Sequence, residues 1–138
     1  MPTPEQLEVA DLYLTKAASD LAAARALASD AGQQDDVVGF HAQQAVEKSM
    51  KAVLALRGSD IPRSHDLVLL ARLASKENDR TPPELEEAQS LSPWAVAMRY
   101  DEMEARLDRD AAIRVAAASL SWADGLVAAA RNATPHRA

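Results

Sequence analysis

The sequence contains no cysteine, and of its 138 residues only four are glycine and 4% are aromatic. The absence of cysteine excludes disulfide bonds and thiolate metal sites. The three histidines form no paired metal-binding motif, and the four scattered glycines form no phosphate-binding loop. The sequence therefore predicts neither a metal site nor a cofactor.

Long apolar runs are also missing, because no uninterrupted stretch approaches the roughly 20 residues of a membrane span. No basic-then-apolar signal peptide opens the chain, so we expect a soluble, cytoplasmic protein with no role in membranes. The net charge of -6 and the pI near 5.0 argue against general coating of nucleic acids, which requires a surplus of lysine and arginine. A local basic site on an acidic protein remains compatible with this charge.

The composition favours helices. Hydrophobic residues make up 48% of the chain and many of them are alanine, as closely packed helices prefer. Apolar residues recur at intervals of three and four, and no alternating strand pattern is present. We expect residues 1–138 to form one all-α domain, an up-and-down bundle of four to five helices, with 131–138 as a frayed tail.

Local signals place the first two helices. Thr3 and Gln6 predict a capping box, and the apolar periodicity predicts a first helix that continues to Gly32. The outer face of this helix is expected to be solvated and carries Glu5, Asp11, Lys16, Asp20 and Arg25. Asp35 or Asp36 is expected to cap a second helix, which ends at Arg57-Gly58.

Two shorter helices and a long one are expected to follow. Ser64 is predicted to cap the third helix, which holds the apolar residues from Leu67 to Ala74. A Thr-Pro-Pro-Glu start at 81–84 predicts a fourth helix that ends near Leu91. Residues 92–100 are either a single helical turn or an ordered loop packed by a tryptophan. The last helix is expected to begin within 101–110.

The second expected helix has two different faces. The first face predicts packing in the core and consists of Val38, Ala42, Ala45, Val46, Ser49, Ala52, Val53 and Leu56. The other face is a polar stripe at helical spacing, formed by His41, Gln44, Glu47, Lys48 and Lys51. Such a stripe is either a solvated face or one wall of a polar site.

The polar stripe supports two interpretations. In the first, His41 is a partly buried imidazole bonded to a neighbouring helix, and Gln43 and Gln44 tie helices together. In the second, His41 and Gln44 bind a ligand while Lys48 and Lys51 attract its phosphate. The residue types alone do not decide between them.

A second polar cluster precedes the third helix and a third follows the fourth. In the structural interpretation of the second cluster, Ser64 and Asp66 cap the helix while His65 orients the loop. In the functional one, Arg63, His65 and free N–H groups at the helix start bind an anion. In the third cluster Arg99 either neutralises the acidic run after it or contributes to a site.

Three blocks of the sequence together resemble a known family. They are Phe40 to Ala52 (FHAQQAVEKSMKA), Pro62 to Leu67 (PRSHDL) and Arg99-Tyr100. In this order they resemble the HEPN domain (higher eukaryotes and prokaryotes nucleotide-binding), in the small stand-alone prokaryotic type, over nearly the whole chain. The resemblance implies a helical bundle, usually a homodimer, that is often encoded beside a minimal nucleotidyltransferase.

Many members of such pairs are toxins that cleave RNA and are neutralised by the transferase, whereas others are nucleotide-binding or accessory domains. The nuclease members carry an arginine followed after four to six residues by a histidine. Here Arg99 is followed by no such histidine, and Arg63 is only two residues from His65. Arg131 and His136 have the required spacing but lie in the expected tail. Enzyme activity is therefore not assigned.

The resemblance leads to one main hypothesis and two alternatives. The main hypothesis is a homodimeric binding module for a nucleotide or RNA that acts with a nucleotidyltransferase in a toxin-antitoxin pair. Its expected ligand-binding residues are His41, Gln44, Lys48, Lys51, Arg63, His65 and Arg99. The first alternative is a metal-independent endoribonuclease toxin that uses His65 and Arg99 or, less favoured, Arg131 and His136. The second is a structural dimer without a ligand.

The expected dimer has weak support in the sequence itself. Four apolar residues lie outside the predicted core face, namely Val37, Phe40, Ala55 and Trp94. Apolar residues that the core does not use are available for contact with a second copy of the chain.

Overall fold

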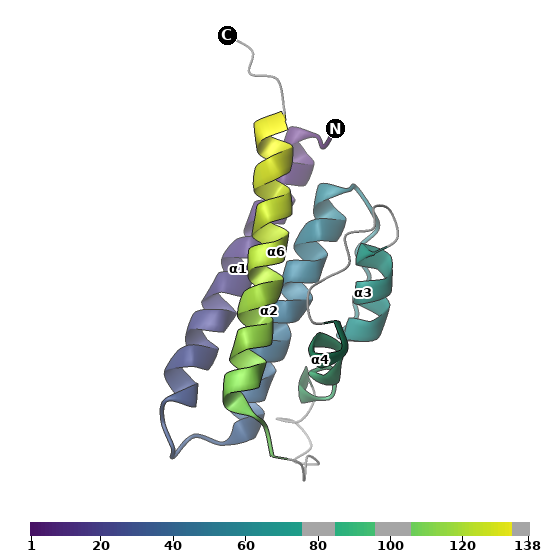
Figure 1. The fold of residues 1–138 in the computed structure, drawn as a ribbon. Coiled ribbons are helices and arrows are strands. Elements are labelled where there is room, and N and C mark those ends of the chain that lie inside the picture. The colour runs from purple at the N-terminus through teal and green to yellow at the C-terminus, as the bar shows by residue number, and fades with distance from the viewer. Residues whose placement is uncertain (76–84, 96–105, 134–138) are drawn as a thin grey trace.

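The computed structural model describes residues 1–75, 85–95 and 106–133 and has five helices there, with no strand in these ranges (Figure 1). They are α1 (Pro4–Ala28), α2 (Asp35–Leu56), α3 (Leu67–Ala74), α4 (Leu85–Ser90) and α6 (Arg109–Ala133). This architecture confirms the predicted all-α bundle of four to five helices.

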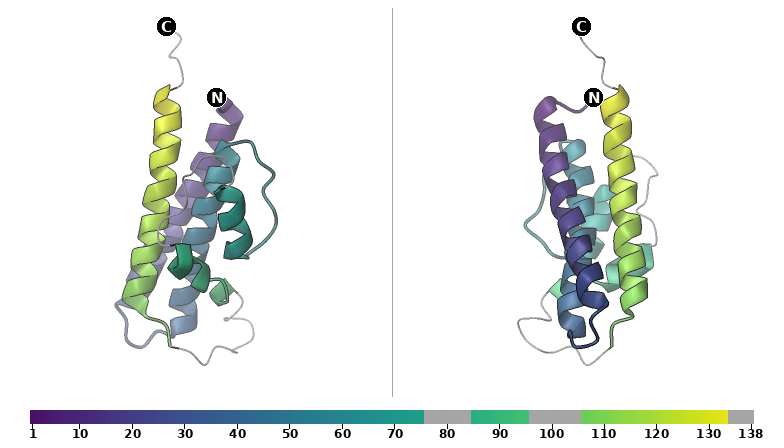
Figure 2. Two further views of the ribbon diagram at one scale, coloured as in Figure 1. Left: turned by 45° about the vertical axis from the view of Figure 1, so that its right-hand side comes forward. Right: turned by 90° about the vertical axis from the view of Figure 1, so that its left-hand side faces the viewer.

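Three long helices make the body of the bundle, and α2 lies at its centre. Helix α1 runs antiparallel to both α2 and α6, and these three helices pack against one another (Figure 1). The short helices α3 and α4 complete the fold, with α3 against α2 and α4 against α3 and α6 (Figure 2). Because α2 has neighbours on most sides, polar residues on it are taken out of water.

The start of α1 follows the prediction. The Thr3 hydroxyl accepts a hydrogen bond from the Gln6 N–H, and the Gln6 side chain accepts one from the Thr3 N–H, so the capping box is confirmed. The helix ends at Ala28, before the predicted Gly32, because the chain turns at Ser29. In this turn the Asp30 carboxylate accepts the Gly32 N–H, a local bond that competes with the helix.

The predicted cap of α2 is wrong. Gln34 is the N-cap residue and makes no side-chain cap bond. The Asp35 carboxylate instead accepts hydrogen bonds from the Leu107 N–H at 3.1 Å and from the Arg109 guanidinium at 2.8 Å. Arg109 also donates to backbone carbonyls of the α1–α2 turn, including Ala28 and Asp30. The turn is therefore tied to the first residue of α6.

The opposite end of α2 follows the prediction. The helix ends at Leu56, and Gly58 adopts a left-handed backbone conformation with φ of 70°. A Cβ atom at this position would lie 2.3 Å from Nε2 of Gln6, the end of a flexible side chain that can move aside. The left-handed conformation is therefore what favours glycine after α2.

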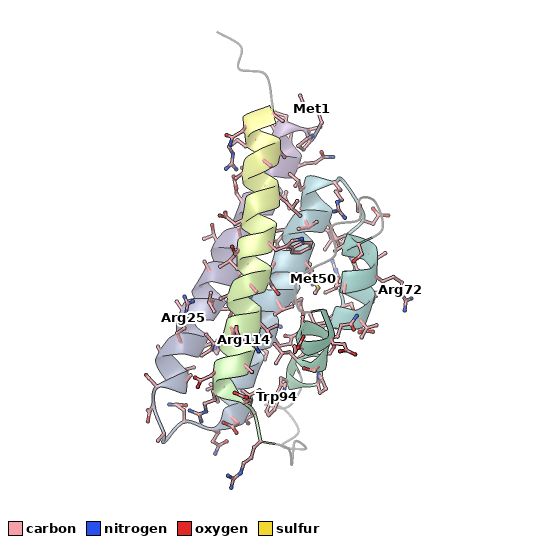
Figure 3. The ribbon with its side chains drawn as sticks, viewed as in Figure 1. Met1, Arg25, Met50, Arg72, Trp94 and Arg114 are labelled. Carbon is pink, nitrogen blue, oxygen red and sulfur yellow. The ribbon has the colours of Figure 1, made fainter. Side chains whose placement is uncertain are left out.

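The core is built on the apolar face predicted for α2. All members of that face are buried except Leu56, which is half-buried. Figure 3 shows Met50 between α2 and α3, where it is fully buried. Trp94, at the end of the bundle where α6 begins, is also buried. Ala55 is buried too, so Ala55 and Trp94 belong to the core and offer no surface to a second copy.

Residues 91–95 form a hydrogen-bonded helical turn that is packed by Trp94, so features of both alternatives for this stretch are present. The predicted fourth-helix start at 81–84 and the rest of the stretch, 96–100, lie outside the described residues. Helix α6 begins at Arg109, within the predicted range, and continues through Ala133. Arg131 is therefore helical rather than part of a frayed tail, and of the expected tail 131–138 the residues 134–138 lie outside the described ranges.

Helix α6 is long and apolar enough to cross a membrane, judged by its length and composition alone. The core helix of a globular bundle meets the same criterion. The buried residues of α6 include Val115, Ala116, Ala123 and Val127, and the helix packs against α1 and α2. A share of 33% of the apolar window of α6 is buried inside the bundle.

Candidate functional site

The carboxylate of Glu47, on α2, is the centre of a buried polar cluster. Its Oε1 atom lies 2.7 Å from Nδ1 of His65 and 3.2 Å from Nε2 of Gln43. Its Oε2 atom lies 3.2 Å from Nζ of Lys51, one helical turn further along α2. The side chain is only 4% exposed, and a carboxylate buried this far is tolerated because hydrogen bonds and a cation replace its water.

His65 is bonded on one side and open on the other. Because the Glu47 carboxylate can only accept, Nδ1 of His65 must carry the proton of the bond between them. The rest of the ring is directed outward, since the side chain is 61% exposed. This arrangement fixes the ring and its tautomer through Nδ1 and leaves Nε2 for solvent or a ligand.

The backbone of His65 is held as well. Gln43 donates from Nε2 to the His65 carbonyl at 3.2 Å, and the Ser92 hydroxyl donates to the same carbonyl at 3.4 Å. Gln44 completes the cluster by donating to Oε1 of Gln43 at 2.6 Å. Gln43 therefore ties α2 to the next segment, at the residue that carries the exposed imidazole, whereas Gln44 bonds only to Gln43 and Glu47 on α2 itself.

The start of α3 differs from the predicted anion site. Asp66 is the N-cap residue and accepts the N–H groups of Val68 and Leu69, while Ser64 accepts the Asp66 N–H. The Leu67 N–H is bonded to the Ser92 hydroxyl at 3.0 Å. The first N–H groups of α3 are therefore occupied by side chains and are not free to bind an anion.

A second carboxylate–imidazole pair joins α1 to α2. Oδ1 of Asp20 lies 3.0 Å from Nδ1 of His41, and its other oxygen accepts from Nζ of Lys48. The Asp20 side chain is only 13% exposed, so the prediction that it lies on a solvated face is wrong. Phe40 contacts the His41 ring edge to face, with 5.4 Å between ring centroids.

These contacts settle the nature of the polar stripe. Gln44, Glu47 and Lys51 are buried, and His41 and Lys48 are partly buried. The stripe is therefore not a solvated face but a row of polar contacts to α1 on one side and to His65 on the other. Lys48 and Lys51 are each paired with a carboxylate, so their charges are largely compensated within the fold.

The comparison with protein families agrees with this arrangement. The HEPN domain model matches residues 10–126, which is most of the chain and includes both carboxylate–imidazole pairs. The chain belongs to the HEPN domain family. No curated protein and no solved structure gives a significant match. Membership supports a module of the nucleotide-binding and RNase type, and the bundle described above is the fold expected of it.

In the HEPN fold, the predicted ligand-binding residues that the structure describes lie in two separate clusters, apart from Arg63. Gln44, Lys51 and His65 meet at Glu47, whereas His41 and Lys48 meet at Asp20. Arg63, two residues before His65, is exposed and, among the candidates that the structure describes, is the cation without an ion pair. Arg99 and His136 lie outside the described residues.

Arg131, from the alternative catalytic pair, is engaged elsewhere. Its Nη2 atom lies 2.5 Å from the carboxylate of Asp11, in a half-exposed pair between α6 and α1. An arginine in an ion pair has less charge to offer a phosphate, although a pair this exposed is weak. In the described part of the chain no group of histidine and acidic residues could hold a metal ion.

Four residues of the HEPN site were not among the predicted ligand-binding residues: Gln43, Glu47, Asp20 and Ser92. Glu47 belongs to the predicted stripe, but the prediction does not identify its carboxylate as the buried centre. A signal for it was present, since Gln43, Glu47 and Lys51 are spaced four residues apart and face one another on a helix. Asp20 and Ser92 carry no such signal, because their partners are distant in sequence.

Proposed function

We propose that this HEPN protein binds a nucleotide or RNA through its phosphate, with His65 and Arg63 as the contacting residues. The observation that supports the proposal is the fixed ring of His65, whose Nδ1 is bonded to the buried Glu47 while most of the ring faces solvent. A protonated imidazole donates from Nε2 to a phosphate oxygen, and a guanidinium supplies a planar pair of donors beside it.

The charge balance favours recognition of one or two phosphates over broad coating of RNA. Lys48 and Lys51 are paired with Asp20 and Glu47, and the protein as a whole has a net charge of -6. Arg63 and the imidazolium form of His65 then supply the attraction locally. A nucleotide or a short single-stranded RNA segment fits such a site better than a duplex does, because a duplex presents a continuous row of phosphates.

Titration calorimetry with 5′-AMP and with a short single-stranded RNA tests this proposal. We expect His65→Ala and Arg63→Ala to lose most of the affinity. His41→Ala is the matched control, because His41 is the other imidazole held by a carboxylate and its pair faces α1. Equal affinity in His65→Ala and the wild type, or equal loss in the control, would contradict the proposed site.

We further propose that the protein forms a homodimer and acts with a minimal nucleotidyltransferase in a toxin-antitoxin pair. This part rests on family membership, because HEPN proteins of this small type often occur in such pairs. Co-expression with a minimal nucleotidyltransferase and recovery of a stable complex tests the partnership, and light scattering tests the dimer. Normal growth of cells that express the HEPN protein alone would contradict the toxin role.

A second function, metal-independent RNA cleavage, is favoured by the same carboxylate–imidazole pair. A buried carboxylate that holds an imidazole by Nδ1 is the arrangement of a general base, and here Nε2 could take the proton of an RNA 2′-hydroxyl while Arg63 stabilises the charged phosphate. Cleavage of defined RNA without added metal, lost in His65→Ala, would establish this function. Activity lost on deletion of 134–138 alone would instead support the tail pair.

A further inference from the structure

We propose that Ser92 is a positioning residue for His65, and that the turn 91–95 holds the imidazole in the orientation needed to meet its ligand. This inference rests on the proposed role of His65 in ligand binding. It adds to that role a residue that is 27 positions away in sequence and lies outside the three sequence blocks that resemble the family.

The Ser92 hydroxyl makes a hydrogen bond to the backbone of each residue that flanks Asp66, the N-cap residue of α3. It accepts the N–H of Leu67 at 3.0 Å and donates to the carbonyl of His65 at 3.4 Å. One hydroxyl can do both, because it has one proton to donate and lone pairs to accept. Ser92 therefore holds the backbone on both sides of Asp66, and together with Gln43 it fixes the His65 carbonyl from which the ring is carried.

The turn that carries Ser92 is itself fixed by packing. Two backbone hydrogen bonds close it, from the Trp94 N–H to the Leu91 carbonyl and from the Ala95 N–H to the Ser92 carbonyl, and two more join it to the end of α4. Leu91, Trp94 and Ala95 are buried. The Trp94 indole lies so close to Gly39 on α2 that a Cβ there would approach it to 2.6 Å. The hydroxyl is thus presented from a rigid element.

These contacts make a closed path that begins and ends on α2. The path runs from Gly39 to Trp94, along the turn to Ser92, across to the His65 backbone, and through the His65 ring to Glu47. Glu47 lies about two helical turns after Gly39, so both ends of the path are set by one helix. A ring that is 61% exposed would otherwise sample several rotamers, and the path restricts it to the one that reaches Glu47.

The test compares Ser92→Ala with Ser92→Thr and with Ser90→Ala. Threonine keeps the hydroxyl, and Ser90 is a matched control because its hydroxyl lies on the same segment but bonds only to the Glu87 carbonyl. The readout is the Nδ1–H resonance of His65 and its rate of exchange with water, measured by NMR on the intact protein without any ligand. RNA affinity is measured in parallel.

We expect exchange of the His65 Nδ1 proton to become about fivefold faster in Ser92→Ala, the effect of one lost neutral hydrogen bond. Ser92→Thr and Ser90→Ala should exchange at the wild-type rate. The proposal is overturned if the resonance is absent from the wild type, if Ser92→Ala exchanges unchanged, or if either comparison variant behaves like Ser92→Ala.

The two readouts separate this proposal from the proposed function. A wild-type protein that binds no RNA but shows the predicted pattern of proton exchange would leave Ser92 as a positioning residue and refute the binding role of His65. A protein that binds RNA through His65 with no change of exchange in Ser92→Ala would refute the positioning role alone.

Discussion

The Nδ1 atom of the exposed His65 ring lies 2.7 Å from Oε1 of Glu47, a carboxylate enclosed within the bundle. The contact joins the segment before α3 to the central helix across 18 residues of sequence. It places one end of an imidazole in the protein interior and the other at the surface. The proposed functions of this HEPN protein depend on that arrangement.

Glu47→Gln should destabilise the protein by about 3 kcal/mol, because it leaves Lys51 buried without its opposite charge. The loss is measurable as a lower midpoint of urea unfolding. Glu86→Gln is the matched control, since Glu86 is exposed on the short helix α4 and its neutralisation should change the free energy of unfolding by less than about 0.5 kcal/mol. Equal midpoints for Glu47→Gln and the wild type would show that the buried charge is not needed.

Asp35 should make folding sensitive to acid. Its hydrogen bond from the Arg109 side chain, with smaller contributions from the Leu107 N–H and nearby arginine charge, lowers the pKa of the carboxyl below the ordinary value of 3.8. The folded state then binds fewer protons than the unfolded state, so the stabilisation is complete above about pH 4 and is lost as the pH falls through the folded-state pKa.

The variant Asp35→Asn tests this pH dependence. The difference in free energy of unfolding between wild type and Asp35→Asn, from urea titrations between neutral pH and about pH 2.5, should be constant near neutrality and shrink below about pH 4. A difference that stays constant over the whole range would show that the Arg109 bond does not favour the charged carboxylate.

Two glycines should respond oppositely to the same substitution. Gly39→Ala should destabilise by about 1 to 3 kcal/mol, because the added Cβ would lie 2.6 Å from the buried Trp94 indole. Gly125→Ala should stabilise by up to about 1 kcal/mol, since nothing lies within 4 Å of the added atom and alanine favours the helix. Thermal unfolding of both variants is the measurement. A Gly39→Ala protein as stable as the wild type would contradict the described packing of Trp94, in the 91–95 turn, against Gly39.

The affinity for RNA should depend only weakly on salt. If Arg63 and His65 neutralise one or two phosphates, the slope of log affinity against log salt for single-stranded RNA should lie between about -0.7 and -1.4. Arg63→Ala should flatten this slope by about 0.7. Fluorescence anisotropy over a range of salt concentrations measures it. A slope steeper than about -3 would indicate a broad basic surface in place of this site.

The elements that could be predicted from the sequence are those set by local signals. The capping box at Thr3, the apolar face of α2 and the stop at Gly58 each depend on residues within a few positions of one another. The prediction of the α2 cap was wrong because the Asp35 carboxylate has a stronger partner in Arg109, which is 74 residues away in sequence. A rule that considers only neighbouring residues does not predict the pairing of Asp35 with Arg109.

The candidate site was only partly predictable for the same reason. His65 and the stripe on α2 were identified from residue types and spacing, but the burial of the stripe depends on how other segments pack over it. Asp20 was expected in water because its neighbours on α1 are charged, whereas the partners that bury it lie on α2. The role of Ser92 depends on the packing of Trp94 against Gly39. The sequence gives no sign that the 91–95 turn and α2 lie in contact.

The most direct test of the central claim is to follow the ring nitrogens of His65 and His41 by NMR while 5′-AMP or a short single-stranded RNA is added. We expect the Nε2 resonance of His65 to shift in a saturable way while its Nδ1–H remains hydrogen-bonded to Glu47, and the His41 ring to stay unchanged. A saturable shift confined to His41, or no shift in either ring at high ligand concentration, would contradict the assignment of the phosphate site to His65.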